Sequence, residues 1–311
     1  MSGITIREAS PKWAKPLIGL YAQSGAGKTY TALLLARGFV GPAGKIVMIE
    51  TESGRGEAYS DPAEYPEIGG YSVISLHEDF SPKTYGAAIS AAEKAKADAL
   101  IIDSGSHEWE GAGGVLAMAA KNTGRGILKW QEAKVDHKTQ FILKLTQTPI
   151  PLVLVCMRGK YPMEKGKDKD GKEEWVRSTV LTPIQDQEIL FEMMIHGWID
   201  QDHNWHGTRY TTRGMHDVFK RDEGKHLTKE TGSRLAEWSK GVNAAGEPIS
   251  DDWIEKAKQV EEDLRAAVDY AQLQAVGQKA SSAIAGFPQA ERERIGDIWN
   301  ELARKLKGPK T

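Results

Sequence analysis

Residues 15–38 read KPLIGLYAQSGAGKTYTALLLARG. An apolar run over residues 17–21 leads into AQSGAGKT at 22–29, and an Ala/Leu-rich stretch of helical character follows. This order of strand, Gly-rich loop and helix is the one that a phosphate-binding loop requires. Such a loop brings successive backbone N–H groups to phosphate oxygens at a helix N-terminus, where the helix dipole also favours negative charge. The stretch therefore predicts a nucleotide site.

Individual residues of this loop have separate expected roles. Gly25 and Gly27 allow backbone conformations that are closed to residues with a Cβ. Lys28 is expected to reach the β- and γ-phosphates of ATP, and the Thr29 hydroxyl is expected to hold Mg²⁺. Alanine replaces the opening glycine of the G-x-x-x-x-G-K-[ST] pattern, and we expect the turn to survive this small change. The predicted cofactor-binding residues of the loop are Ala22, Gln23, Ser24, Gly25, Ala26, Gly27, Lys28, Thr29 and Tyr30.

The composition is that of a globular chain. Of the 311 residues, 40% are hydrophobic and 27% are charged, and there is no long apolar run. The N-terminus has no apolar stretch typical of a targeting signal, so we expect a cytoplasmic protein without a membrane partner. Cys156 is the single cysteine, which excludes an intramolecular disulfide and a cysteine zinc cluster. The net charge of −2 means that any nucleic-acid surface must be local.

Two later apolar runs end in acidic residues. Residues 45–49 are followed by Glu50 and Glu52, and residues 99–102 by Asp103 and Ser104. Continuous apolar runs are typical of parallel strands buried on both faces, whose C-terminal ends meet at a ligand crevice. We expect Glu52 to orient or deprotonate the attacking water, with an acidic cap as the alternative. Asp103 is expected to join the Mg²⁺ shell, usually through water, and Asp103 and Ser104 complete the predicted cofactor-binding set.

The segment after Asp103 leaves the strand with polar residues and glycines. His107 and Glu108 could sense the γ-phosphate or assist the water, and Glu108 is the second choice to Glu52. A loop that packs through Trp109 is the alternative.

A charged segment follows the apolar run at 151–157. Asp170-Gly171 is a two-residue hairpin signal, and the sequence predicts a mobile, basic β-ribbon within residues 159–180. Basic residues with Tyr161 and Trp175 would suit the backbone and stacked bases of single-stranded DNA. Interspersed acidic residues weaken this reading, and a solvated charged hairpin is the alternative. The candidate DNA contacts are Lys160, Lys165, Lys167, Lys169, Lys172 and Arg177.

An antiparallel extension is predicted over residues 187–214. It consists of a strand at 187–198 and a partner strand at 207–213. Arg209 and Arg213 are candidates to reach the γ-phosphate held by a neighbouring subunit, which requires a homo-oligomer with shared ATP sites; surface ion pairs are the alternative. Several histidines gather nearby, but the spacing of His203 and His206 is loop-like, which disfavours a metal site.

The sequence divides into an ATP-binding core at 1–245 and a helical domain at 246–311. Apolar residues recur at helical spacing from residue 250, and further helices are expected at 270–284 and 289–306. Because this region carries no catalytic constellation, we expect it to serve assembly or to recruit a single-strand DNA-binding protein or another recombination partner.

The series AQSGAGKT, VMIETE and LIIDSGSHEWEG resembles the RecA-like P-loop ATPases of bacteriophages, a group related to RecA-like single-strand annealing proteins. The resemblance covers about residues 15–240. It implies an α/β RecA-like P-loop NTPase core with a mainly parallel sheet, followed here by a small helical bundle. It also implies that Lys28 and Thr29 bind nucleotide and Mg²⁺, that Glu52 is catalytic, and that a DNA-binding loop follows Arg158.

The chain departs from that family in two places. The strand end VCMR lacks the usual glutamine sensor, and the segment before Pro16 is shorter than a RecA polymerisation arm. These departures favour annealing or an accessory role over strand exchange on a filament. The sequence thus predicts an Mg²⁺-dependent ATPase that binds single-stranded DNA and promotes annealing or homologous recombination, in the host cytoplasm if phage-encoded. A nucleotide-switched, non-catalytic scaffold and a P-loop kinase with a basic lid are the alternatives.

Overall fold

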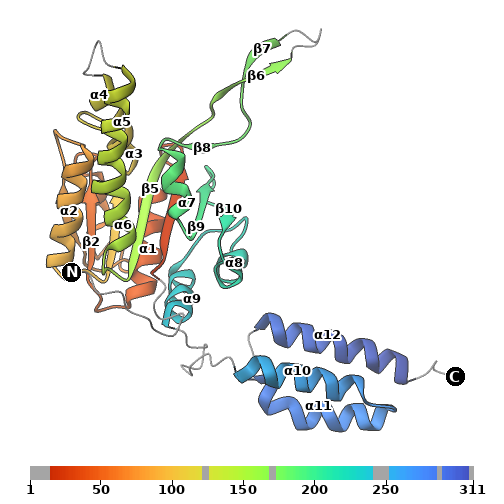
Figure 1. Ribbon diagram of the computed structural model, residues 1–311. Coiled ribbons are helices and arrows are strands. Elements are labelled where there is room, and N and C mark those ends of the chain that lie inside the picture. The colour runs from red at the N-terminus through yellow and green to blue at the C-terminus, as the bar shows by residue number, and fades with distance from the viewer. Residues whose placement is uncertain (1–14, 121–125, 168–172, 241–251, 286–288, 308–311) are drawn as a thin grey trace, which may run out of the picture. The chain divides into compact units, whose positions relative to one another are not determined.

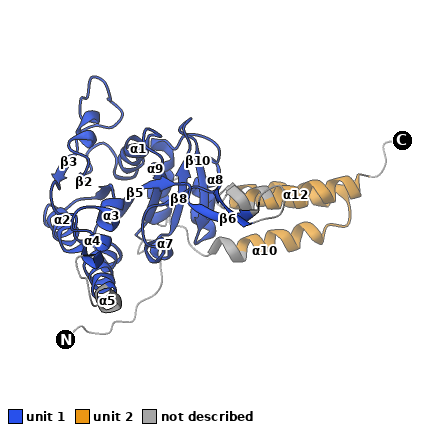
Figure 2. Cartoon of the chain, turned by 90° about the horizontal axis from the view of Figure 1, so that it is seen from above, with its two compact units in different colours: residues 1–240 blue, residues 241–311 orange. Residues whose placement is uncertain are grey.

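The chain forms two compact units, residues 1–240 and residues 241–311 (Figure 2). The computed structural model describes residues 15–120, 126–167, 173–240, 252–285 and 289–307. The predicted domain boundary between residues 245 and 246 lies outside the described residues. In the part of the chain that is described, no helix combines the length and the apolar character needed to cross a membrane.

A mainly parallel sheet forms the centre of the first unit (Figure 1). Its strand order is β10-β9-β1-β5-β4-β2-β3, with β8 paired to the end of β5. Neighbouring strands from β9 to β3 run parallel, and β10 is antiparallel to β9. The prediction of an α/β fold with a mainly parallel sheet is confirmed. The strands are β1 (Leu17–Ala22), β2 (Ile46–Glu50), β3 (Ser72–Ser75), β4 (Ala99–Asp103), β5 (Leu152–Lys160), β8 (Thr182–Pro183), β9 (Ile195–Ile199) and β10 (Trp205–Tyr210).

Helices cover both faces of this sheet and form the connections between its strands. The helices of the first unit are α1 (Lys28–Val40), the 3-10 helix η2 (Arg55–Tyr59), α2 (Pro82–Lys94), α3 (Ser106–Glu110), α4 (Val115–Ala120), α5 (Gly126–Asp136), the π-helical stretch η3 (His137–Ile142), α6 (Leu143–Gln147), α7 (Gln187–Glu192), α8 (Arg213–Lys220) and α9 (Lys229–Lys240).

Alternate residues of the central strands enter two separate hydrophobic cores. Ile18 and Leu20 of β1 belong to the core that α1, α8 and α9 cover, whereas Leu17 and Tyr21 belong to the core on the face of α2 and η3. Successive side chains of a strand point to opposite faces, so a strand covered on both sides must be apolar throughout. This explains the continuous apolar runs in the sequence. Cys156 is fully buried in the first core, as expected for a small apolar side chain.

The predicted extension at 187–214 is wrong in part. Residues 187–192 form α7, because the Asp186 carboxylate caps the helix by accepting a hydrogen bond from the Glu188 N–H. The strand that follows, β9, is parallel to β1, so within the predicted extension the antiparallel strand is β10. Arg213 begins α8 and does not lie on a strand. The expected loop after Asp103 also contains the short helix α3.

A separate two-stranded ribbon leaves the sheet after β5 (Figure 1). It consists of β6 (Met163–Lys167) and β7 (Glu173–Arg177), which pair antiparallel. The two strands agree with the predicted hairpin, and residues 168–172 between them lie outside the described residues.

The second unit contains α10 (Asp252–Arg265), α11 (Tyr270–Ala285) and α12 (Gln289–Leu306). Its small core includes Leu264, Leu273 and Ile295. Each helix buries one apolar face against the other two, so its apolar residues recur at helical spacing. This spacing is why the sequence predicts the three helices.

Candidate nucleotide site

The loop between β1 and α1 leaves backbone donors available at the start of a helix. Gly25 and Gly27 both have φ of 84°, in the left-handed region that glycine adopts without strain. Gly27 is the N-cap of α1, and among the described residues no side chain caps this helix. The first N–H groups of a helix have no partner within it. The loop therefore presents hydrogen-bond donors and the positive end of the α1 dipole to an anion.

Lys28 lies across this loop. Its Nζ donates hydrogen bonds to the carbonyl of Ala22 (3.3 Å) and to that of Gln23 (3.1 Å). Both acceptors are neutral carbonyl groups, so these two bonds hold the ammonium near the N–H donors of the loop without neutralising its charge. Ala26 is fully buried and belongs to the core beneath the loop, whereas Ser24 and Gly25 are exposed. The alanine at position 22 continues β1, so the turn forms without the opening glycine.

Asp103 meets the loop from the end of β4. The Thr29 hydroxyl donates a hydrogen bond to the Asp103 carboxylate. Burial raises the pKa of Asp103, and the bond from Thr29 and the charge of Lys28 oppose that rise. A hydroxyl beside a buried carboxylate is an oxygen donor set that suits Mg²⁺. These residues fit a magnesium–nucleotide complex.

A sequence family described as AAA domain matches residues 14–200, which is more than half of the chain. The chain belongs to this AAA domain family. The matched residues include the loop, β4 and the strands between them, and the family indicates nucleotide binding and ATPase chemistry. No curated protein matches the sequence significantly.

In this AAA domain, two glutamates at the end of β2 have different hydrogen-bond and ion-pair partners. Glu50 is buried, and its carboxylate accepts hydrogen bonds from the N–H of Glu52 (2.6 Å) and of Gly54 (3.1 Å). Glu52 is partly exposed and pairs with Arg55 at 3.2 Å. Its charge raises the pKa of Asp103. Glu50 therefore holds the loop after β2, whereas the partly exposed Glu52 pairs with Arg55 and adds negative charge to the surroundings of Asp103.

The residues after Asp103 lock the ends of β2 and β4 together. Ser104 is buried, and its N–H donates to the Thr51 hydroxyl at 2.8 Å, while its carbonyl accepts a bond from Tyr85. The same Thr51 hydroxyl lies 2.7 Å from His107 Nδ1. Burial lowers the pKa of His107, and the Glu52 charge opposes this shift. Thr51 therefore joins both Ser104 and His107 to the end of β2.

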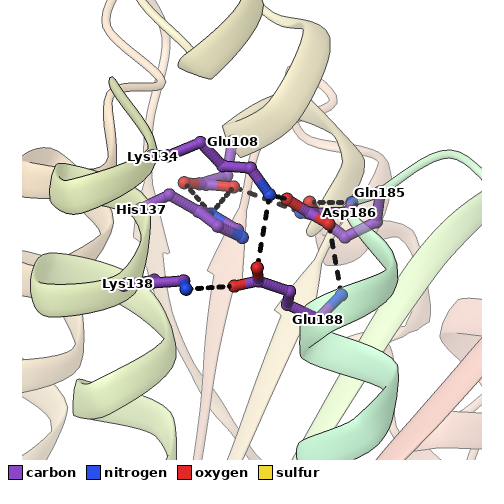
Figure 3. A network of polar contacts seen from close by, with 7 residues as sticks. All are labelled: Glu108, Lys134, His137, Lys138, Gln185, Asp186 and Glu188. Atoms are coloured by element: carbon purple, nitrogen blue, oxygen red, sulfur yellow. Dashed lines mark hydrogen bonds and ion pairs between the residues drawn. The ribbon is translucent and has the colours of Figure 1, made fainter. Parts of the chain in front are cut away.

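Glu108 faces a different part of the molecule (Figure 3). It is fully buried, and its carboxylate lies 2.9 and 3.1 Å from His137 Nδ1. Gln185 Nε2 donates to Glu108 at 3.2 Å and to the Gly105 carbonyl at 2.8 Å. Burial raises the pKa of Glu108, although the bond from His137 opposes that rise. Glu108 is therefore a buried network residue, and the alternative that it assists water in the crevice is not supported by its position.

This buried network continues to the surface through Lys134. Its ammonium contacts the Asp186 carboxylate and lies 3.7 Å from Glu188, which also pairs with Lys138 at 3.0 Å (Figure 3). The network joins α3, α5, η3 and the start of α7. Sequence analysis missed His137, Gln185 and Asp186, because no motif or spacing relates His137 to a residue pair so much later in the chain.

The arginines predicted to act across a subunit interface lie at the sheet edge. The Arg209 guanidinium is 5.5 Å from the Phe191 ring centroid, and it donates to the Leu190 carbonyl at 3.4 Å. Arg213 is exposed at the start of α8. Neither contacts the loop of its own chain in these interactions, so their predicted role in a neighbouring site stays a prediction.

The histidines nearby do not form a metal site. His206 Nε2 lies 2.9 Å from the Asp200 carboxylate, and its ring stacks on Trp198 with centroids 4.2 Å apart. Within the described parts of the chain, no cluster of three or more His, Cys, Asp or Glu residues could hold a metal ion.

The candidate DNA contacts lie on and beside the ribbon. Lys160 is exposed at the end of β5, Lys165 pairs with Glu173 at 3.3 Å, and the Arg177 guanidinium lies 5.0 Å from the Tyr161 ring centroid. Lys169, Lys172 and the side chain of Lys167 lie outside the described residues.

Proposed function

We propose that this AAA domain protein hydrolyses ATP in the presence of Mg²⁺ at the loop between β1 and α1. The observation that carries the proposal is the contact of Thr29 with the buried Asp103 beside an uncapped, glycine-bounded start of α1. A loop that had only a structural role would have the first N–H donors of α1 capped by a side chain.

The residues divide the chemistry between them. The N–H groups at the start of α1 bind phosphate oxygens, and Lys28 stabilises the negative charge on the phosphoryl group. Thr29 and Asp103 hold the magnesium ion, which supplies positive charge to the phosphate oxygens when it is bound. Glu52 orients the attacking water and accepts its proton. The bond between the γ-phosphorus and the bridging oxygen breaks as the water oxygen attacks, which yields ADP and phosphate.

The proposal extends to single-stranded DNA as the effector, and the register of the ribbon supports this. Lys165 lies opposite Trp175, and Met163 lies opposite Arg177. Cross-strand partners share a face and alternate residues change faces, so these four residues lie on one face. Glu164 and Glu174 fall on the other face. The acidic residues that weaken the sequence pattern are thus partly separated from the basic and aromatic ones.

The exposed aromatic residue of this face provides a test of DNA binding. Trp175 is 65% exposed, as expected for a ring that stacks on a base and not on the protein. Trp175→Ala should weaken binding of a labelled single-stranded oligonucleotide by about 1–3 kcal/mol. Phe191→Ala on α7 is the control, because Phe191 is equally exposed but lies off the ribbon. Equal affinities of the Trp175 variant and the unmodified protein, measured by fluorescence anisotropy, would reject the ribbon as the DNA contact.

The proposal has three more specific parts: annealing or recombination, the recruitment of a partner by α10–α12, and an arginine supplied by a neighbouring subunit. They rest on the phage RecA-like resemblance. ATP hydrolysis measured with and without single-stranded DNA at two salt concentrations tests the DNA role, since phosphate contacts weaken steeply with salt. Stimulation that falls with salt supports the DNA role. Hydrolysis indifferent to DNA favours a kinase or a DNA-free switch, and DNA binding without hydrolysis favours a scaffold.

A further inference from the structure

The loop between β9 and β10 places His203 against the phosphate-binding loop. A Cβ added to Gly27 would lie 2.9 Å from His203 Nδ1, 3.6 Å from Cε1 and 3.7 Å from Cγ. The imidazole therefore lies over the N-cap of α1, at the point where the backbone donors of the loop converge. His203 is nevertheless exposed, so part of its ring faces solvent beside the loop.

The backbone of His203 is left-handed. Its φ is 66°, a conformation that glycine adopts freely and that few other residues adopt, chiefly asparagine, aspartate and histidine. The turn is held by the Asp200 carboxylate, which accepts hydrogen bonds from the N–H of Asp202 (2.9 Å) and of Asn204 (2.8 Å). The His203 N–H donates to the Asp200 carbonyl at 3.1 Å. A glycine would fit this turn more easily, so the backbone alone does not explain the histidine.

A second histidine supports the ring from the outer side. His226 Nε2 donates to the Asp202 carbonyl at 2.9 Å, and its ring meets that of His203 edge to face with centroids 6.0 Å apart. The Asp200 carboxylate forms hydrogen bonds with Asn204 and His206 within the turn, and these are its partners in place of the His203 ring. The His203 ring is therefore held in position against Gly27.

The strand order places His203 on a defined side of the loop. Asp103 and Glu52 follow β4 and β2, which lie on one side of β1, whereas His203 follows β9 on the other side. A triphosphate whose terminal phosphate faces Asp103 and Glu52 has its α-phosphate and sugar farthest from them. From this geometry we infer that His203 is a nucleotide-binding residue that contacts the α-phosphate and sugar, and that it takes no part in hydrolysis. This inference rests on the proposed nucleotide site.

The variant His203→Gly separates binding from folding. Glycine accepts φ of 66° without strain, so the variant should melt at the same temperature or higher. Loss of one hydrogen bond to a charged phosphate should raise the Kd of both ADP and ATP about tenfold. The effect is the same for both nucleotides because they share the α-phosphate and sugar, and kcat at saturating ATP should not change. His203→Asn, which also tolerates this backbone, should show the same loss.

His216→Ala is the control, because His216 is an exposed histidine on α8 that contacts Tyr210 and Asp217 and does not contact the loop. Its Kd for ADP should equal that of the unmodified protein. The inference is overturned if His203→Gly binds ADP normally, or if it weakens ATP alone, which would place the contact at the terminal phosphate. Failure of the unmodified protein to bind ADP would reject the proposed nucleotide site itself and is distinguishable from either result.

Discussion

The nucleotide site and the network around Glu108 both contain a buried carboxylate, but they are built in opposite ways. Asp103 and the loop come from short, contiguous stretches of sequence, and the N–H donors at the start of α1 have no cap among the described residues. Glu108 is bonded to His137 and Gln185, which come from distant parts of the chain. Paired groups stabilise a fold, whereas groups left available in a crevice bind a ligand. The comparison predicts that changes at the first region affect chemistry and that changes at the second affect stability.

Lys28→Ala should have the largest effect on chemistry. The ammonium lies over the loop and provides charge where the phosphoryl group is transferred. Loss of one such charge should lower ATP hydrolysis by about 100-fold or more, with an unchanged melting temperature. Lys45→Ala is the matched control, because Lys45 is exposed and its ammonium donates to the carbonyl of Ala95, the residue that follows α2. An active Lys28→Ala protein would falsify the assignment of the site.

Glu52→Gln tests whether the carboxylate beside Asp103 acts on water. Glutamine keeps the size of the side chain but cannot accept a proton, so hydrolysis should fall by about 100-fold. ATP affinity should be retained, as measured by equilibrium binding. Glu50→Gln is the informative contrast, since Glu50 accepts two backbone hydrogen bonds and should mainly lower stability. If Glu50→Gln abolishes hydrolysis in a stable protein and Glu52→Gln does not, the two roles are exchanged.

These two regions also differ in how far the sequence predicts them. The loop, β4 and the three helices of the second unit follow from local patterns, since each needs only residues near one another in the chain. The short apolar run in residues 187–192 is compatible with a strand or a helix, and the sequence analysis predicts a strand. The segment forms a helix, which the Asp186 side chain caps. The contacts of Gln185 and His203 depend on the sheet order, which brings distant loops together, and no local pattern contains that information.

Gln185→Ala should affect stability. The variant removes the donor to Glu108 and to the Gly105 carbonyl, and leaves a buried carboxylate with fewer partners. The free energy of unfolding should fall by about 1–3 kcal/mol, measured by denaturant titration. Gln140→Ala is the control, because Gln140 contacts only its neighbour Thr139 through its amide in the described interactions. Unchanged stability of Gln185→Ala would show that the network does not hold the fold.

The smallest expected effect is a pH dependence that arises from Glu108. Burial raises its pKa above the ordinary value of 4.5, so the native state binds more protons than the unfolded state between the ordinary and the raised pKa. The free energy of unfolding therefore decreases as the pH rises through this interval, by at most about 1.4 kcal/mol for each unit of pKa difference. Asp103 has a shift of the same sign, so the measurement must isolate Glu108.

The variant Glu108→Gln provides that isolation, because it removes one titrating group and leaves Asp103 unchanged. The stability of the unmodified protein relative to the variant should be greatest below pH 4.5 and should decrease as the pH rises, since only the glutamate acquires a buried charge. Chemical denaturation of both proteins at several pH values gives this difference directly. A difference that increases with pH would mean that His137 and Gln185 stabilise the carboxylate more than burial destabilises it. The Glu108 network would then hold an ionised carboxylate by hydrogen bonds from His137 and Gln185 and would not be a neutral network.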